Sequence, residues 1–364
     1  MVPQARAYSC RVATVQTGYG VSGVGLAWEN DAADESCDVV TDRAPDGPLA
    51  CPVCGGETVV RLRGQYDDRY GYPGQWDRRR CRRCGHATLD ARFSDEDLGR
   101  LYTEWYPRAA NRYEDTKPYR SLQGFRAWLD GTRHSAFRSV PPNVSVLDIG
   151  CAYGHTLAYH AERGCRAVGI EADQHAVAEG RRQGLDIRQG LFDAGDFEPG
   201  SFDYVTLDQV LEHAQDPRAF LAGVATVLKP GGAVVVSTPN VGGYGARLLG
   251  RRWIHWHPPY HLNVFNRTSL SRLAHDVGLE VRSIRTVTDS GWLRHQWFHF
   301  FTRGRPGESS VYWDPRRKGR PRRRARAGAR WLDRLHAFQL VTRLADALGL
   351  GDNMLAILVK PGPQ

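Results

Sequence analysis

Ser145-Val-Leu-Asp-Ile-Gly-Cys-Ala-Tyr-Gly154 is the stretch that decides the fold. Its apolar start predicts a buried strand, and its end carries three small residues, Gly150, Ala152 and Gly154. Small residues let the backbone turn sharply and approach a ligand closely. A helical pattern follows, so the N-terminus of a helix would face that ligand. The loop alone does not say which nucleotide binds, and a nicotinamide dinucleotide is one alternative.

Short apolar runs alternate with helical patterns through the rest of the chain. Strands that alternate with helices predict a parallel, doubly wound α/β sheet. The predicted strands are 145–150, 167–171, 187–190, 202–207, 233–238, 279–287 and 354–360.

Changes in composition divide the chain into four parts. Residues 1–48 have weak periodicity and are expected to form a poorly ordered leader. Residues 49–91 hold the paired cysteines, and 92–142 have the helical character of a cap or linker. The α/β domain is predicted over 143–364, with an insertion at about 288–352 that is too long for a plain loop.

Positive charge is concentrated in one segment of the 364-residue chain. The net charge is +9, and residues 314–330 alone hold nine Lys or Arg against one Asp. An amphipathic helix is predicted directly afterwards, over 331–348, so contact between the 316–330 run and a membrane surface is one option. A solvated loop and a nucleic-acid contact are the others. No signal peptide or membrane-spanning run is recognisable, and we expect a cytoplasmic protein.

Two closely spaced cysteine pairs stand in the segment 49–91. Cys51-Pro-Val-Cys54 and Cys81-Arg-Arg-Cys84 are each followed by glycine, as in zinc knuckles. Two such turns supply four thiolates, which suit a closed tetrahedral structural zinc site. His86 is a possible substitute ligand, and free reduced thiols are the alternative.

Two acidic residues follow predicted strands. Glu171 ends the second strand, where a carboxylate can accept hydrogen bonds from both ribose hydroxyls. Asp193 follows the third strand, where a carboxylate can accept from an adenine amino group. Together with the glycine loop, they predict a site for an adenosine-containing cofactor.

Two longer motifs carry a family resemblance. Phe202-Asp-Tyr-Val-Thr-Leu-Asp-Gln-Val-Leu-Glu-His213 and Leu228-Lys-Pro-Gly-Gly-Ala-Val-Val-Val-Ser-Thr-Pro-Asn240 follow the loop in order. This series resembles class I S-adenosylmethionine-dependent methyltransferases, most strongly the branch of the ubiquinone-pathway O-methyltransferases. The resemblance covers about 143–288 and the last strand. It implies a Rossmann-like methyltransferase sheet, here with an N-terminal zinc ribbon and a helical insertion before the last strand.

The resemblance also implies which residues bind S-adenosylmethionine. Relatives often have glycine where this chain has Ala152, and alanine is small enough to serve. By this resemblance, the methionine and ribose end of the cofactor is contacted by Asp148, Gly150, Ala152 and Gly154, and the ribose by Glu171. The adenine is contacted by Phe192 and Asp193, and the methyl region by Asp208 and Gln209.

Candidate bases lie after the fifth strand, a position that faces the substrate in class I enzymes. His261 is our first choice and His257 our second, and His213, which follows the fourth strand, is a third. The alternative is that His261 only shapes its loop. Relatives carry a Glu-x-x-Glu-His segment that can hold a divalent ion, but here Gln209 replaces the first Glu, and an amide is a weaker ligand. A buried helix start at Glu212 and His213 is therefore favoured over a metal site.

The sequence favours methyl transfer to a hydroxyl of a small molecule, such as a secondary metabolite or a sugar intermediate. An RNA methyltransferase is the rival enzyme, although the positive charge is confined to one late segment, so a nucleic-acid partner is not favoured. A catalytically silent cofactor-binding scaffold is the other alternative. The oligomeric state and the acceptor's identity are not predicted.

Overall fold

The computed structural model describes residues 49–106, 124–132, 135–317, 319, 321 and 323–362. The leader predicted over 1–48 lies outside these residues. Within them, every helix is too short or too polar to cross a lipid bilayer.

A seven-stranded sheet forms the centre of the α/β region, in the order β10-β11-β8-β7-β4-β5-β6. The strands from β8 to β6 are parallel, and β11 and β10 add antiparallel at one edge. All seven predicted strands are present, so the predicted fold class is confirmed. Their bounds are β4 (Ser145–Ile149), β5 (Arg166–Glu171), β6 (Ile187–Gln189), β7 (Phe202–Asp208), β8 (Leu228–Pro239), β10 (Glu280–Val287) and β11 (Asn353–Val359).

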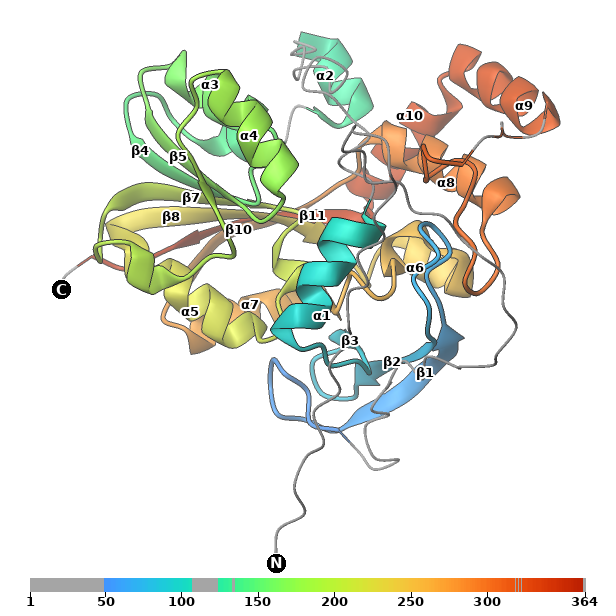
Figure 1. The fold of residues 1–364 in the computed structure, drawn as a ribbon, viewed down its shortest axis with the longest axis horizontal. Helices are drawn as coiled ribbons and strands as arrows, with labels where there is room; N and C mark the ends of the chain where they lie inside the picture. The colour runs from blue at the N-terminus through green and yellow to red at the C-terminus, as the bar shows by residue number, and fades with distance from the viewer. Residues whose placement is uncertain are drawn as a thin grey trace, which may run out of the picture. The chain divides into compact units, whose positions relative to one another are not determined.

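Helices cover both faces of this sheet (Figure 1). On one face, α3 (His155–Ala161) and α4 (Gln174–Arg182) contact β5, and on the other, α5 (Pro217–Val227) and α7 (Arg267–Asp276) contact β8 and β10. The middle of each central strand is apolar and fully buried, as at Leu147 and Val205. Burial on both faces explains why these strands are continuous apolar runs.

The cysteine segment forms a small antiparallel sheet whose fourth strand comes from elsewhere in the chain. It contains β1 (Thr58–Gln65), β2 (Trp76–Cys81) and β3 (Ala87–Leu89), and β9 (Asn263–Val264) pairs with β3. A two-residue strand has no hydrophobic period to detect, so sequence analysis missed β9. The boundaries proposed at residues 91 and 142 stay predictions.

The insertion before β11 differs from the single amphipathic helix predicted over 331–348. The helix breaks at His336, whose φ of 52° cannot continue a right-handed helix. The predicted apolar face consists of Trp331, Leu335, Phe338, Val341, Leu344 and Leu348. Five of these six residues are exposed, and only Phe338 is buried. The helices here are α8 (Ser290–Thr302), α9 (Arg323–Arg334) and α10 (Ala337–Ala347); α1 (Asp95–Arg100), α2 (Gly124–Asp130) and α6 (Tyr244–Leu248) lie earlier in the chain.

Candidate functional site

The loop after β4 has the backbone that its small residues predict. Gly150, Ala152 and Gly154 all have positive φ, at 75°, 49° and 81°. A Cβ on Gly150 would lie 2.6 Å from a methyl of Val210, so this loop passes directly against the segment after β7. Left-handed backbone at three alternate positions turns the chain tightly and fits the close approach of a cofactor.

Glu171, at the end of β5, ties this loop to the sheet. Its carboxylate accepts from the backbone N–H of Ala152 at 3.0 Å and from that of Asp173 at 2.9 Å. A carboxylate oxygen has more than one lone pair, so accepting a backbone N–H does not by itself prevent a hydrogen bond from a ribose hydroxyl. The predicted ribose contact fits this geometry and stays a prediction.

Asp148 is directed into the protein rather than toward solvent. Its two oxygens accept from the hydroxyls of Thr156 on α3 and Thr206 on β7. Burial raises the pKa of this carboxyl to about 6, and the two threonine hydroxyls oppose that shift. In this structure Asp148 joins β4, β7 and α3, and its predicted contact with the cofactor stays a prediction.

The remaining predicted cofactor residues lie at the carboxyl ends of β6 and β7. Phe192 packs edge-on against Phe220 with ring centroids 5.5 Å apart, while Asp193 is exposed and accepts from the Gly195 N–H at 2.8 Å. Burial raises the pKa of Asp208. Gln209, with φ of 58°, donates to Ser237 Oγ at 3.0 Å and to Asn353 Oδ1 at 3.3 Å. Sequence analysis did not single out Ser237 or Asn353.

Three predicted catalytic histidines are brought together beside the end of β7. The His213 and His261 rings are 4.8 Å apart, and the His257 and His261 rings 5.0 Å. His261 Nδ1 lies 2.8 Å from the backbone oxygen of His255, which can only accept. Nδ1 therefore carries the proton, and Nε2 is left as the basic nitrogen.

These imidazoles are kept neutral by their surroundings. Burial, together with neighbouring His213 and Arg69, places the pKa of His261 well below its ordinary 6.5. Burial and Arg69 do the same for His257. Only a neutral imidazole can accept a proton. Because burial lowers the pKa, these histidines stay neutral down to a lower pH than an exposed histidine does.

Glu212 completes a cluster with two of the histidines. One ligand atom each of Glu212, His213 and His261 lie within 4.8 Å of one another. Glu212 Oε2 accepts from Thr238 Oγ1 at 2.9 Å, whereas the buried Oε1 has no hydrogen-bond partner among the described residues. Burial raises the pKa of this carboxyl to about 8. Two imidazoles and a carboxylate are a donor set that suits divalent transition metals.

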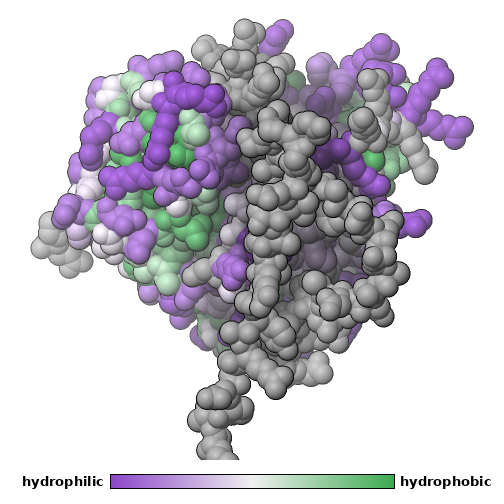
Figure 2. Space-filling model, viewed as in Figure 1, coloured by the Kyte–Doolittle hydropathy of each residue, from purple (hydrophilic) through white to green (hydrophobic). Residues whose placement is uncertain are grey.

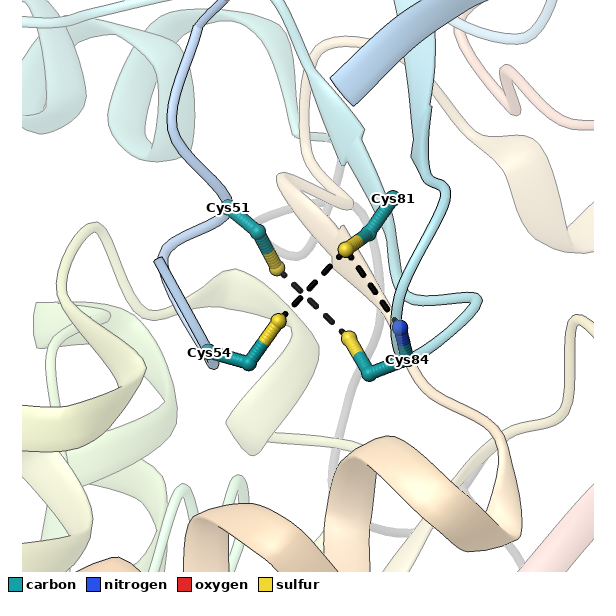
Figure 3. Close-up of side chains that lie close together, drawn as sticks. All are labelled: Cys51, Cys54, Cys81 and Cys84. Carbon is teal, nitrogen blue, oxygen red and sulfur yellow. Dashed lines mark hydrogen bonds between the residues drawn. The ribbon is translucent and has the colours of Figure 1, made fainter. Parts of the chain in front are cut away.

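The four paired cysteines converge as the zinc prediction requires (Figure 3). Cys51 Sγ is 3.7 Å from Cys84 Sγ, and Cys54 Sγ is 3.5 Å from Cys81 Sγ. A tetrahedral site with Zn–S bonds of about 2.3 Å has sulfurs roughly 3.8 Å apart, so the four thiols fit Zn²⁺. His86 lies apart from the cluster and bonds Asn263 Oδ1 through Nε2 at 3.0 Å.

The ribbon, formed by the cysteine segment 49–91, also holds the histidine loop, residues 253–263, in place. Arg78 on β2 is fully buried, and its guanidinium donates to the backbone oxygens of His261 and Trp256, each at 2.9 Å. Its Nε donates to Gln65 Oε1 at 3.1 Å. Asn263, on β9, donates to the Ala214 oxygen just after His213. Sequence analysis missed Arg78, because nothing in the local pattern of β2 links it to residues about 180 positions away.

Comparison with known proteins decides the family. A family model described as a methyltransferase domain matches residues 95–284, over half of the chain. The chain is a class I S-adenosylmethionine-dependent methyltransferase by family. The matched range runs from α1 to β10 and includes the glycine loop, Glu171 and the histidine loop.

Two curated relatives each match about half of this chain or less. The ubiquinone biosynthesis O-methyltransferase of Xanthomonas campestris pv. campestris (strain B100) is 36% identical over 142 residues, 36% of this chain and 57% of that protein. The protein of the same name from Stutzerimonas stutzeri (strain A1501) is 29% identical over 199 residues, 51% of this chain and 83% of that protein. A solved structure, the [4+2]-cyclase SpnF, aligns with a TM-score of 0.44 and 19% identity over 74% of this chain and 97% of its own.

Replacement of Glu171 by alanine is expected to weaken cofactor binding by at least about a hundredfold, because two hydrogen bonds to a charged acceptor are lost. Calorimetry with S-adenosylhomocysteine measures this. The exposed Glu162 provides a matched control, and Glu162→Ala should bind as the native protein does. Unchanged affinity in a folded Glu171→Ala protein would reject the assigned ribose site.

The purified protein is expected to hold about one equivalent of structural zinc, since four thiolates leave no open position. Elemental analysis measures this, and Cys81→Ser should lower the melting temperature. Cys165→Ser is the control, because Cys165 is a free cysteine outside the cluster. A zinc-free native protein of equal stability would refute the site.

Proposed function

We propose that this protein transfers the methyl group of S-adenosylmethionine to a hydroxyl of a small-molecule acceptor. The observation that carries the proposal is the neutral, buried His261, whose Nε2 is basic and which lies beside His213 and Glu212. Family membership supports the cofactor. The named function of the relatives, O-methylation in ubiquinone biosynthesis, supports a hydroxyl acceptor.

The reaction needs positioning and one proton transfer. The acceptor oxygen attacks the methyl carbon as the carbon–sulfur bond breaks, and S-adenosylhomocysteine leaves as a neutral thioether. The oxygen becomes more acidic as the new bond forms, so its proton passes to His261 Nε2. Glu212 and His213 follow Val210, which touches the glycine loop, so this cluster lies near the proposed methyl region.

The same cluster suits a divalent cation, which would be held by Glu212, His213 and His261 and would lower the pKa of an acceptor hydroxyl. Loss of turnover on chelation, with retention of the ribbon zinc, would favour this version. Turnover that survives chelation would favour His261 as the proton acceptor.

The two other functions considered for this chain have less support. An RNA methyltransferase would need a basic track leading to the site, and the residues of the histidine loop are instead buried among tyrosines. A catalytically silent cofactor-binding scaffold would not need a buried imidazole that can accept a proton. A small molecule that carries a hydroxyl group is therefore the preferred acceptor.

His261→Ala is expected to cut turnover by about a hundredfold or more, the contribution typical of a general base, and to keep cofactor affinity within a few fold. His257→Ala should have a smaller effect. The assay needs the true acceptor, found by screening hydroxylated small molecules with labelled S-adenosylmethionine. Because the pKa of His261 is lowered, the native rate should fall only as pH drops well below 6.5.

Two variants serve as controls for the His261 experiment. His261→Asn keeps a donor for the His255 oxygen but has no basic nitrogen, so it should be as slow as the alanine variant. His275→Ala changes a histidine whose side chain is 87% exposed on α7, and its turnover should be native. Native turnover by His261→Asn on the true acceptor would place the base elsewhere.

A further inference from the structure

Exposed apolar side chains gather on the helices of the insertion and on α2. Of the thirteen large apolar side chains that the described residues expose, ten lie on or directly after these helices. They are Phe125, Trp128, Phe300, Phe301, Trp331, Leu335, Leu340, Val341, Leu344 and Leu348. Scattered single residues are common on protein surfaces, whereas a gathered set marks an interaction site.

Helix α10 shows how this set is presented. Leu340, Leu344 and Leu348 recur every four residues and are 60%, 63% and 64% exposed. The opposite side of the helix, at Phe338 and Thr342, is buried against its neighbours. Residues four apart lie on one helix face, so the three leucines form a continuous outward stripe.

The charges that accompany this stripe have one sign. Arg323, Arg324, Arg330 and Arg334 on α9 are exposed. In Figure 2, hydrophilic side chains project over the position of α9, with apolar surface beside them.

No carboxylate on α9 or α10 balances these arginines. Both helices are described over their full lengths, and each holds one carboxylate, Asp333 on α9 and Asp346 on α10, which pairs with another residue. Asp333 lies 3.8 Å from Arg294, and Asp346 is bonded to Thr288 and paired with Arg343.

We propose that the leucine stripe of α10 and the four exposed arginines of α9 together form a basic-apolar surface that docks on an anionic phospholipid bilayer. Such a bilayer offers negative headgroups for the guanidinium groups and an acyl region for the leucines. Trp331, 61% exposed, follows Arg330 directly, and tryptophan favours the boundary between headgroups and chains. The inference concerns where the enzyme works and does not depend on its acceptor.

The alternative occupants fit less well. A second copy of the chain would bring two arginine-rich surfaces together, and like charges across an interface repel. A nucleic acid would match the charge, but its phosphates and sugars leave a leucine stripe without apolar partners. Both become outcomes of the test.

The test is co-sedimentation of the full chain with vesicles of phosphatidylglycerol and phosphatidylcholine, compared with phosphatidylcholine alone. Native protein should bind the anionic vesicles, and binding should weaken as salt screens the arginines. Leu340→Asp with Leu344→Asp should reduce binding by about tenfold or more, because both side chains would carry charge into the acyl boundary. Leu248→Asp, at an apolar residue 77% exposed on α6, is the matched control and should bind normally.

Four results would overturn the proposal. Native protein that fails to bind anionic vesicles excludes the bilayer. Equal binding by the Leu340→Asp/Leu344→Asp double variant assigns any lipid contact to another surface. A dimer in sedimentation velocity that the double variant abolishes identifies a second copy as the occupant. Patch-dependent binding of single-stranded RNA, without vesicle binding, identifies a nucleic acid.

Discussion

The buried guanidinium of Arg78 is the constraint on which the proposed site depends. It projects from the ribbon and donates to two backbone oxygens of the histidine loop, at Trp256 and His261. Pairing of β3 with β9, directly after His261-Leu262, also fixes the C-terminal end of that loop. If the buried guanidinium of Arg78 lost these acceptors, its charge would be left unpaired, which is strongly destabilising. The ribbon and the loop therefore hold each other in one conformation.

These contacts between the ribbon and the histidine loop extend the consequence of the zinc prediction to the proposed active site. Four thiols that fit Zn²⁺ lie at one end of a sheet whose last strand, β9, directly follows His261-Leu262. A metal that fixes the ribbon would thus also fix where His261 and its basic nitrogen lie. We infer that the ribbon shapes the proposed acceptor side of the site, while the glycine loop and Glu171 shape the proposed cofactor side.

The sequence predicted the features that are local along the chain. The seven strands follow from apolar runs, and the sulfur cluster follows from two paired spacings. The β3–β9 pairing and the Arg78 contacts join residues more than 170 positions apart, and no local pattern encodes them. The apolar face after residue 330 was recognised, but a pattern cannot say which side of a helix is buried, and most of that face is exposed.

The contact between the ribbon and the histidine loop is tested most directly by comparing amide hydrogen exchange in the zinc-loaded and the chelator-stripped protein. Amides of Trp256 and His261 bond to the oxygens of Trp253 and His257 and should be protected with zinc present. On stripping, peptides covering 253–263 should lose protection together with those covering 51–86, while β4 and β5 stay protected. Loss of protection in the ribbon alone, with 253–263 unchanged, would contradict the claim that the ribbon holds the histidine loop.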